Sequence, residues 1–134
     1  MNRRTFLATA AAFAATPAFA VTQYTPGLVA ERLAAGETVF LDFTASWCTT
    51  CAAQARQIKA LKDANPAYEQ AITFIDVDWD TYRSADLTKS LNIPRRSTLV
   101  VLKGEEELGR IVAGTGRAQI KALMDTALGA ATAS

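Results

Sequence analysis

The chain has 134 residues, half of them hydrophobic and a fifth charged, which is the balance of one folded domain rather than a disordered chain. Fourteen basic residues stand against thirteen acidic ones, so no cationic excess points to nucleic acid or to an anionic membrane surface. The sequence has no histidine, which excludes Ser-His and Cys-His catalytic pairs and removes the commonest metal ligand.

The first twenty residues are typical of a cleavable signal peptide. A basic start at Arg3 and Arg4 is followed by an alanine-rich apolar run over 5–15, by Pro17, and by the small-x-small cleavage pattern Ala18–Ala20. The apolar run is shorter than the roughly 20 residues that a membrane-spanning helix needs. We therefore expect a signal peptide over 1–20, with an uncleaved anchor or a buried first helix as the alternative.

Export would place the remaining domain, residues 21–134, in the periplasm. This domain holds twelve basic and thirteen acidic residues, and so a net charge of −1. Its 114 residues are enough for a real, if small, hydrophobic core. The segment Arg3–Leu7 also resembles the twin-arginine signal of proteins that are exported folded. Asn2 stands where Ser or Thr is usual in that signal, which leaves the general secretory route open.

Apolar periodicity and turn residues predict eight elements in this domain. Thr25 and Pro26 suit the start of the first helix, which Gly36 ends. Pro66 ends the second helix, and a turn at 103–104 joins the last two strands as a hairpin. In chain order we expect a helix over 25–35, a strand over 38–44, a helix over 48–64, a strand over 72–78, a helix over 84–91, strands over 98–102 and 108–113, and a helix over 117–128.

The order of these elements predicts an α/β fold. The helix between the first two strands is long enough for a right-handed parallel crossover, whereas the last two strands form an antiparallel pair. The expected architecture is a mixed central sheet with helices on both faces.

The only two cysteines, Cys48 and Cys51, stand where the first strand ends and the second helix begins. A disulfide across so short a loop would add little stability, because such a bond stabilises mainly by closing a long loop of the unfolded chain. The N–H groups and the dipole of a helix N-terminus instead stabilise an anion, and they can lower a thiol pKa from about 8.5 to about 3.5–7.5. The pair therefore predicts redox chemistry. A zinc site is disfavoured, because structural zinc takes four ligands.

The segment Phe40–Cys51 resembles the active site of the thioredoxin superfamily. It has Trp-Cys-x-x-Cys after an apolar strand, and an aspartate six residues before the first cysteine. The similarity continues through 98–104 and the final helix, and so covers nearly all of residues 21–134. It implies the thioredoxin fold and a thiol–disulfide oxidoreductase that carries electrons through a redox-active Cys48–Cys51 disulfide.

The resemblance also implies a role for each site residue. Cys48 is the nucleophile that attacks a substrate disulfide, and Cys51 resolves the mixed disulfide. Asp42 matches the family's buried carboxylate, which helps Cys51 lose its proton; a strand-edge aspartate in solvent is the alternative. Trp47 packs beside the site, as a substrate-lining residue or as an ordinary core aromatic. We expect no cofactor and no metal.

One departure from the family lies in the loop that faces the cysteines. The family has a cis-proline there, but gapless spacing back from Gly104 places Ser97 at that position, followed by Thr98. We expect Ser97 and Thr98 to line the site, with a trans peptide before Ser97 and its hydroxyl able to donate to a sulfur. A remodelled loop that uses Pro94 instead is the alternative.

A second departure is Asp76, which falls where the family has a lysine near the buried aspartate. Two carboxylates close together would raise one of the two pKa values. The alternative is that Asp76 points to solvent beside Asp78 and Asp80.

Within the superfamily, the overall pattern resembles the C-terminal periplasmic domain of DsbD more than a cytosolic thioredoxin, on the export signal, the stretch Asp76–Asp80 and the short helix after it. Members of that group pass electrons from a membrane carrier of the DsbD/CcdA kind to periplasmic disulfides. The resemblance therefore implies a monomeric reductant of client proteins that needs a membrane electron donor. One alternative is a DsbA-type disulfide oxidase, although the chain has no room for that family's helical insertion. Another is a Cys-x-x-Cys module for a soft metal such as Cu(I).

Overall fold

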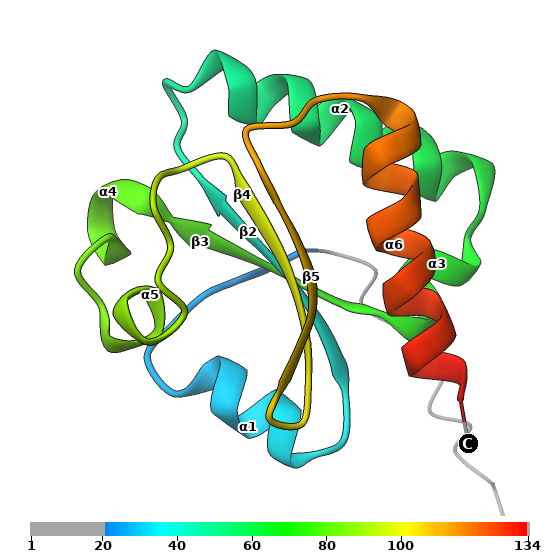
Figure 1. Ribbon diagram of the computed structural model, residues 1–134, viewed down its shortest axis with the longest axis horizontal. Coiled ribbons are helices and arrows are strands. Elements are labelled where there is room, and N and C mark those ends of the chain that lie inside the picture. Colours follow the sequence, from blue (N-terminus) through cyan, green and yellow to red (C-terminus); the bar gives the residue numbers. More distant parts are fainter. Residues whose placement is uncertain (1–20, 134) are drawn as a thin grey trace, which may run out of the picture.

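The computed structural model of the protein describes residues 21–133, so the predicted signal peptide over 1–20 lies outside the described residues. Within this range the chain forms one five-stranded sheet in the order β1-β3-β2-β4-β5 (Figure 1). No helix between residues 21 and 133 is both long and apolar enough to cross a membrane. The elements are β1 (Thr22–Gln23), α1 (Leu28–Ala34), β2 (Thr38–Thr44), α2 (Thr49–Ala64), α3 (Ala67–Ala71), β3 (Thr73–Asp78), α4 (Trp79–Tyr82), α5 (Asp86–Ser90), β4 (Thr98–Lys103), β5 (Glu106–Val112) and α6 (Arg117–Thr132).

The sheet is mixed, as the order of the elements predicts. β1 and β2 both run parallel to β3, with α2 and α3 forming the crossover from β2 to β3. β4 runs antiparallel to β2 and to β5, and β4 and β5 form the predicted hairpin. The thioredoxin fold, an α/β fold, is thus confirmed, and β2 occupies the centre of the sheet.

Three short elements were not predicted: β1, α3 and α4. Each has five residues or fewer, which is too short for a hydrophobic period to show. The first helix also begins later than predicted. The Leu28 N–H donates to the Thr25 carbonyl at 3.0 Å and Gly27 has a φ of 89°, so Pro26 and Gly27 form a type II turn ahead of the helix.

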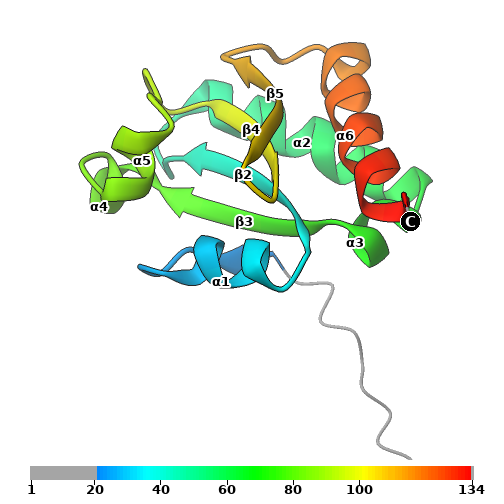
Figure 2. The same ribbon diagram turned by 60° about the horizontal axis from the view of Figure 1, so that its bottom comes forward.

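The hydrophobic core has two halves, one on each face of the sheet. Figure 2 shows α1 on one side of the strands and α2 and α6 on the other. Alternation along β2 divides its side chains: Val39, Leu41 and Phe43 pack on the α1 face, and Phe40 packs with α2, α3 and α6. Asp42 follows the same alternation, so it belongs to the α2 face. A carboxylate is thereby placed in a buried layer of a central strand.

Candidate active site

Cys48 and Cys51 form a disulfide at the point where the chain leaves the sheet and enters α2, with their Cα atoms 5.2 Å apart. Cys48 is the N-cap of α2, and its sulfur accepts a hydrogen bond from the Cys51 backbone N–H at 3.1 Å. The two residues are only 4% and 2% exposed. A thiolate at Cys48 would gain this N–H bond and the positive end of the helix dipole, both of which favour the charged form.

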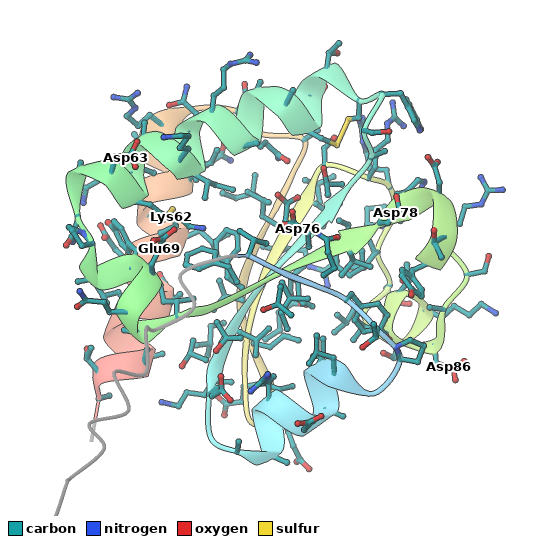
Figure 3. All side chains as sticks on the ribbon, turned by 180° about the vertical axis from the view of Figure 1, so that it is seen from behind. Lys62, Asp63, Glu69, Asp76, Asp78 and Asp86 are labelled. Carbon is teal, nitrogen blue, oxygen red and sulfur yellow. A yellow bond between two sulfur atoms is a disulfide. The ribbon has the colours of Figure 1, made fainter. Side chains whose placement is uncertain are left out.

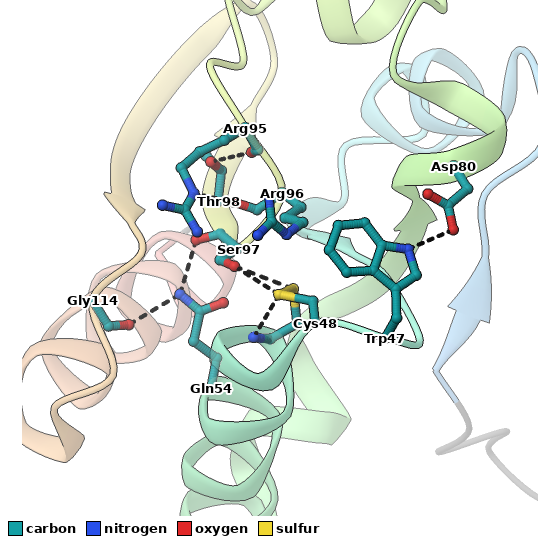
Figure 4. The surroundings of a disulfide bond; sticks show 10 residues. Trp47, Cys48, Gln54, Asp80, Arg95, Arg96, Ser97, Thr98 and Gly114 are labelled. Carbon is teal, nitrogen blue, oxygen red and sulfur yellow. Dashed lines mark hydrogen bonds between the residues drawn. A yellow bond between two sulfur atoms is a disulfide. The ribbon is translucent and has the colours of Figure 1, made fainter.

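Ser97 faces both sulfurs. Its Oγ lies 3.2 Å from the sulfur of Cys48 and 3.2 Å from that of Cys51, and the residue is fully buried (Figure 4). Pro94, the other candidate for this position, is exposed, and no peptide bond in residues 21–133 is cis. The residue found by counting back from Gly104 without a gap, Ser97, is therefore the one that contacts the disulfide.

The backbone at Ser97 is unusual, because its φ of 62° lies in the left-handed region that few non-glycine residues adopt. Hydrogen bonds on both sides hold it there. The Ser97 N–H donates to the Phe43 carbonyl at 2.7 Å, and the Ser97 carbonyl accepts from the Ala113 N–H at 2.8 Å. The loop is thus tied to the end of β2 and to the end of β5.

Gln54, one turn after Cys51 on α2, is a site residue that sequence reasoning missed. It is fully buried, and its Nε2 donates to the Ser97 carbonyl at 2.9 Å and to the Gly114 carbonyl at 3.0 Å (Figure 4). A polar residue three positions after Cys51 lies on the same helix face as that cysteine, which is the signal that would have found it. Gln54 joins α2 to the two loops beside the disulfide.

Trp47 forms the exposed side of the site, with 57% of its surface accessible. Its indole Nε1–H donates to the Asp80 carboxylate at 2.8 Å, and the Arg96 guanidinium lies 4.5 Å from the ring centroid. Trp47 is therefore not an ordinary core aromatic. Thr98 is fully buried, and its hydroxyl donates to the Arg95 carbonyl at 2.7 Å, so it braces the loop that carries Ser97.

Asp42 lies in the central strand and is only 8% exposed, which overturns the alternative of an edge aspartate in solvent. Burial raises its pKa to about 8, and the nearby charge of Asp76 adds to the rise, while Lys62 opposes it. Asp76 is the register partner of Asp42 on β3 and is partly buried, so it does not extend into solvent beside Asp78. Burial also raises the pKa of Asp76, again opposed by Lys62. The two carboxylates thus face the same layer.

Lys62 supplies the positive charge near this carboxylate pair, and it comes from α2. Its side chain is 9% exposed, with Nζ 3.5 Å from Glu69 and 3.8 Å from the centroid of the Phe74 ring. Burial lowers its pKa, which Glu69 partly offsets. Lys62, Glu69 and Asp76, which are labelled in Figure 3, border a cavity of about 470 Å³ that also reaches Asp42. Sequence reasoning missed Lys62, because a lysine on a helix is usually a solvent-facing residue.

The sequence model of the family described as thioredoxin matches residues 21–126. The chain belongs to the thioredoxin family. Among solved structures, a thioredoxin-like protein (Trxlp) from Edwardsiella tarda is 28% identical, with a TM-score of 0.65 over 79% of this chain and 96% of that one. The oxidised mitochondrial thioredoxin 3 of Saccharomyces cerevisiae is 22% identical, with a TM-score of 0.63 over 78% of this chain and 93% of that one. Among curated protein sequences, none matches this chain.

Membership of the thioredoxin family indicates what the disulfide does. A Cys-x-x-Cys pair at this point of the fold is a redox-active disulfide, and the arrangement suggests thiol–disulfide oxidoreductase chemistry. Two further features of this site are a serine against both sulfurs and a carboxylate pair with a lysine of α2 nearby.

Proposed function

We propose that the protein is an exported thiol–disulfide oxidoreductase that reduces disulfides in client proteins of the periplasm. The observation that carries the proposal is the Cys48–Cys51 disulfide at the N-terminus of α2, where the Cys48 sulfur already accepts a backbone N–H. That bond and the helix dipole favour a thiolate at Cys48, and the thiolate is the attacking species in disulfide exchange.

In the reduced protein the Cys48 thiolate attacks one sulfur of a client disulfide. The client disulfide breaks, one client thiolate leaves, and Cys48 forms a mixed disulfide with the other sulfur. Cys51 then loses its proton and attacks the Cys48 sulfur, which releases the second client thiolate. Two electrons have passed to the client, whose two sulfurs take up protons, and the protein is left with the Cys48–Cys51 disulfide.

Asp42 is the group that we propose as the proton acceptor for Cys51. Its pKa of about 8 suits a group that must both take and give a proton near neutral pH. Asp42 also lines the cavity that Lys62 and Glu69 border, which offers the proton a way toward solvent.

A client segment would bind beside Trp47. The sulfur of Cys48 is hardly accessible, whereas the neighbouring indole is exposed and carries the Arg96 guanidinium on its face. Contact with an aromatic surface adds apolar burial at little loss of side-chain freedom. A client disulfide would therefore be steered to Cys48 across this surface.

The periplasmic location, the monomeric state and a membrane electron donor of the DsbD/CcdA kind rest on the signal-peptide pattern and on the resemblance to the C-terminal domain of DsbD. A reductant in an oxidising compartment must be re-reduced after each turnover, which is why such a donor is part of the proposal. Within the part of the chain that the structure describes, no group of three or more His, Cys, Asp or Glu side chains is placed to hold a metal ion. The copper-binding alternative thus rests on Cys48 and Cys51 alone.

Insulin reduction by the purified protein, with dithiothreitol as the electron source, tests the proposed reaction. We expect the wild-type protein to accelerate precipitation of the insulin B chain and Cys48→Ser to abolish the effect. Thr49→Ser is the matched control, because it changes the residue next to the nucleophile at the start of α2 and keeps its hydroxyl; it should leave the activity unchanged. A wild-type protein no faster than dithiothreitol alone would refute the reductase proposal.

A further inference from the structure

We infer that Ser97 is a catalytic residue whose hydroxyl donates a hydrogen bond to whichever cysteine sulfur carries negative charge, and that Gln54 is the residue that positions it. The inference rests on the proposed function, since it concerns the same dithiol. It adds a group that a proline at this position could not supply, because a proline side chain has no donor.

The direction of the hydrogen bonds follows from the chemistry of the disulfide. Neither sulfur of the Cys48–Cys51 bond carries a hydrogen, so the Ser97 hydroxyl is the donor in both contacts. Its Oγ is 3.2 Å from each sulfur, which makes the single hydrogen available to either. A turn of the O–H bond is enough to pass the hydrogen bond from one sulfur to the other.

The equal distances suit a reaction in which charge moves between the two cysteines. In the reduced protein the Cys48 thiolate accepts from the Cys51 backbone N–H, and the hydroxyl adds a second donor. Cys51 loses its proton before it attacks the mixed disulfide, and the same hydroxyl can donate to the Cys51 thiolate that this leaves. Ser97 keeps its own proton throughout. It stabilises charge where charge develops.

The backbone around Ser97 is arranged to hold the hydroxyl in this place. At a φ of 62° a glycine would be free of strain, and the hydroxyl is what serine adds. The amide of Gln54 spans from α2 to the carbonyls of Ser97 and Gly114, as Figure 4 shows. The Gln54 side chain is itself fully buried. Gln54 therefore fixes the loop relative to the helix that carries both cysteines.

The charged groups near the dithiol come from several elements. Arg96 precedes Ser97 in the loop and stacks on Trp47, while Asp80 of α4 accepts from that indole. Asp42 lies on β2, the strand that leads into the site. These groups also influence a thiolate at Cys48, so the test must change the hydroxyl and leave all of them in place.

Ser97→Gly makes that change, because glycine accepts the φ of 62° and lacks only the side chain. The pKa of the Cys48 thiol is measured in the reduced protein from the ultraviolet absorbance of the thiolate. We expect it to rise by about one pH unit, the effect of losing one hydrogen bond to a charged group. Ser97→Ala, which keeps the β-carbon, should give a similar rise.

Gln54→Met removes the positioning amide and keeps the length of the side chain. It should raise the Cys48 pKa by less than Ser97→Gly does, because the hydroxyl is loosened but present. Gln57→Met, one turn further along α2, is the matched control, because the Gln57 amide is half-buried and accepts from the Arg117 guanidinium instead of bonding to the Ser97 loop; it should leave the pKa unchanged. Circular dichroism checks that each variant is folded.

A Cys48 pKa that does not rise in Ser97→Gly and Ser97→Ala would overturn the role of the hydroxyl. An equal rise in Gln54→Met and Gln57→Met would overturn the role of Gln54. If Ser97→Ala does not fold, Ser97→Gly decides, since its backbone is the less strained. These titrations need no client, so they stand apart from insulin reduction, whose failure in the wild-type protein would refute the proposed function instead.

Discussion

Replacing Asp42 by Asn tests whether the side chain of Asp42 is buried in its protonated form. A pKa of about 8 in the folded protein stands far above the value of about 3.9 expected in the unfolded chain. The folded state therefore binds the proton more tightly than the unfolded state. The stability that this group contributes is fully present below the unfolded pKa, and it is lost as the pH rises toward 8.

Between these two pKa values the unfolded chain has released the proton and the folded protein has kept it. The free energy of unfolding should then fall by about 1.4 kcal/mol per pH unit on account of Asp42, or by about 2.7 kcal/mol from about pH 5 to about pH 7. Asp42→Asn removes this slope. One carboxylate oxygen of Asp42 has no hydrogen-bond partner among the described residues, so the amide of the variant is buried there without a partner as well. An unsatisfied buried polar group lowers the free energy of unfolding by about 1–3 kcal/mol, and it does so at every pH.

The readout is therefore the pH dependence and not the stability at one pH. Urea unfolding of the oxidised protein, followed by tryptophan fluorescence, is measured for both proteins at several pH values across this range. The difference in unfolding free energy should shift in favour of Asp42→Asn as the pH rises. Asp63→Asn, on the exposed part of α2, is the control and should leave the slope unchanged. Parallel curves for the wild-type protein and Asp42→Asn would refute a raised pKa at Asp42.

Three further predictions follow from the site. Cys51→Ser should trap mixed disulfides between Cys48 and client proteins, seen as thiol-sensitive adducts on non-reducing gels; turnover without adducts would show that Cys51 is not the resolving thiol. Lys62→Met should raise the pKa of Asp42 further, because Lys62 opposes the rise, so the pH window of stability loss should extend upward; a lower pKa by carboxyl NMR would contradict this. Ser97→Pro should destabilise the fold by more than about 1 kcal/mol, because proline cannot adopt a φ of 62° and lacks the N–H that donates to Phe43; unchanged urea unfolding would show that the loop remodels freely.

The elements that position the site could be predicted, because their signals are strong over several residues. The apolar run over 38–44 is β2 as observed, and the stretch after Cys48 is α2 to within one residue. Pro66 follows the end of that helix, as predicted. The helix after it, α3, has only five residues, which is too short to show a hydrophobic period. Local sequence therefore determined the framework around the cysteines but not its shortest connections.

The surroundings of the disulfide were predictable only in part. Spacing from Gly104 located Ser97, because an unbroken strand, β4, joins the two positions. The left-handed backbone at Ser97 could not be predicted, since serine has no preference for it and the conformation is imposed by bonds to β2, β5 and α2. Gln54 and Lys62 were missed for the same reason. Both are polar residues on a helix, which are usually exposed, and only for Gln54 does the spacing from Cys51 give a signal of burial.

The equilibrium reduction potential of the Cys48–Cys51 couple decides whether the protein reduces or oxidises its clients. It is measured by equilibrating the protein with redox buffers of known potential and quantifying the free thiols. We predict a reducing couple, nearer the value of about −270 mV of thioredoxin than the value of about −120 mV of DsbA. A potential near the DsbA value would contradict the reductase function and make the protein an oxidant of its clients.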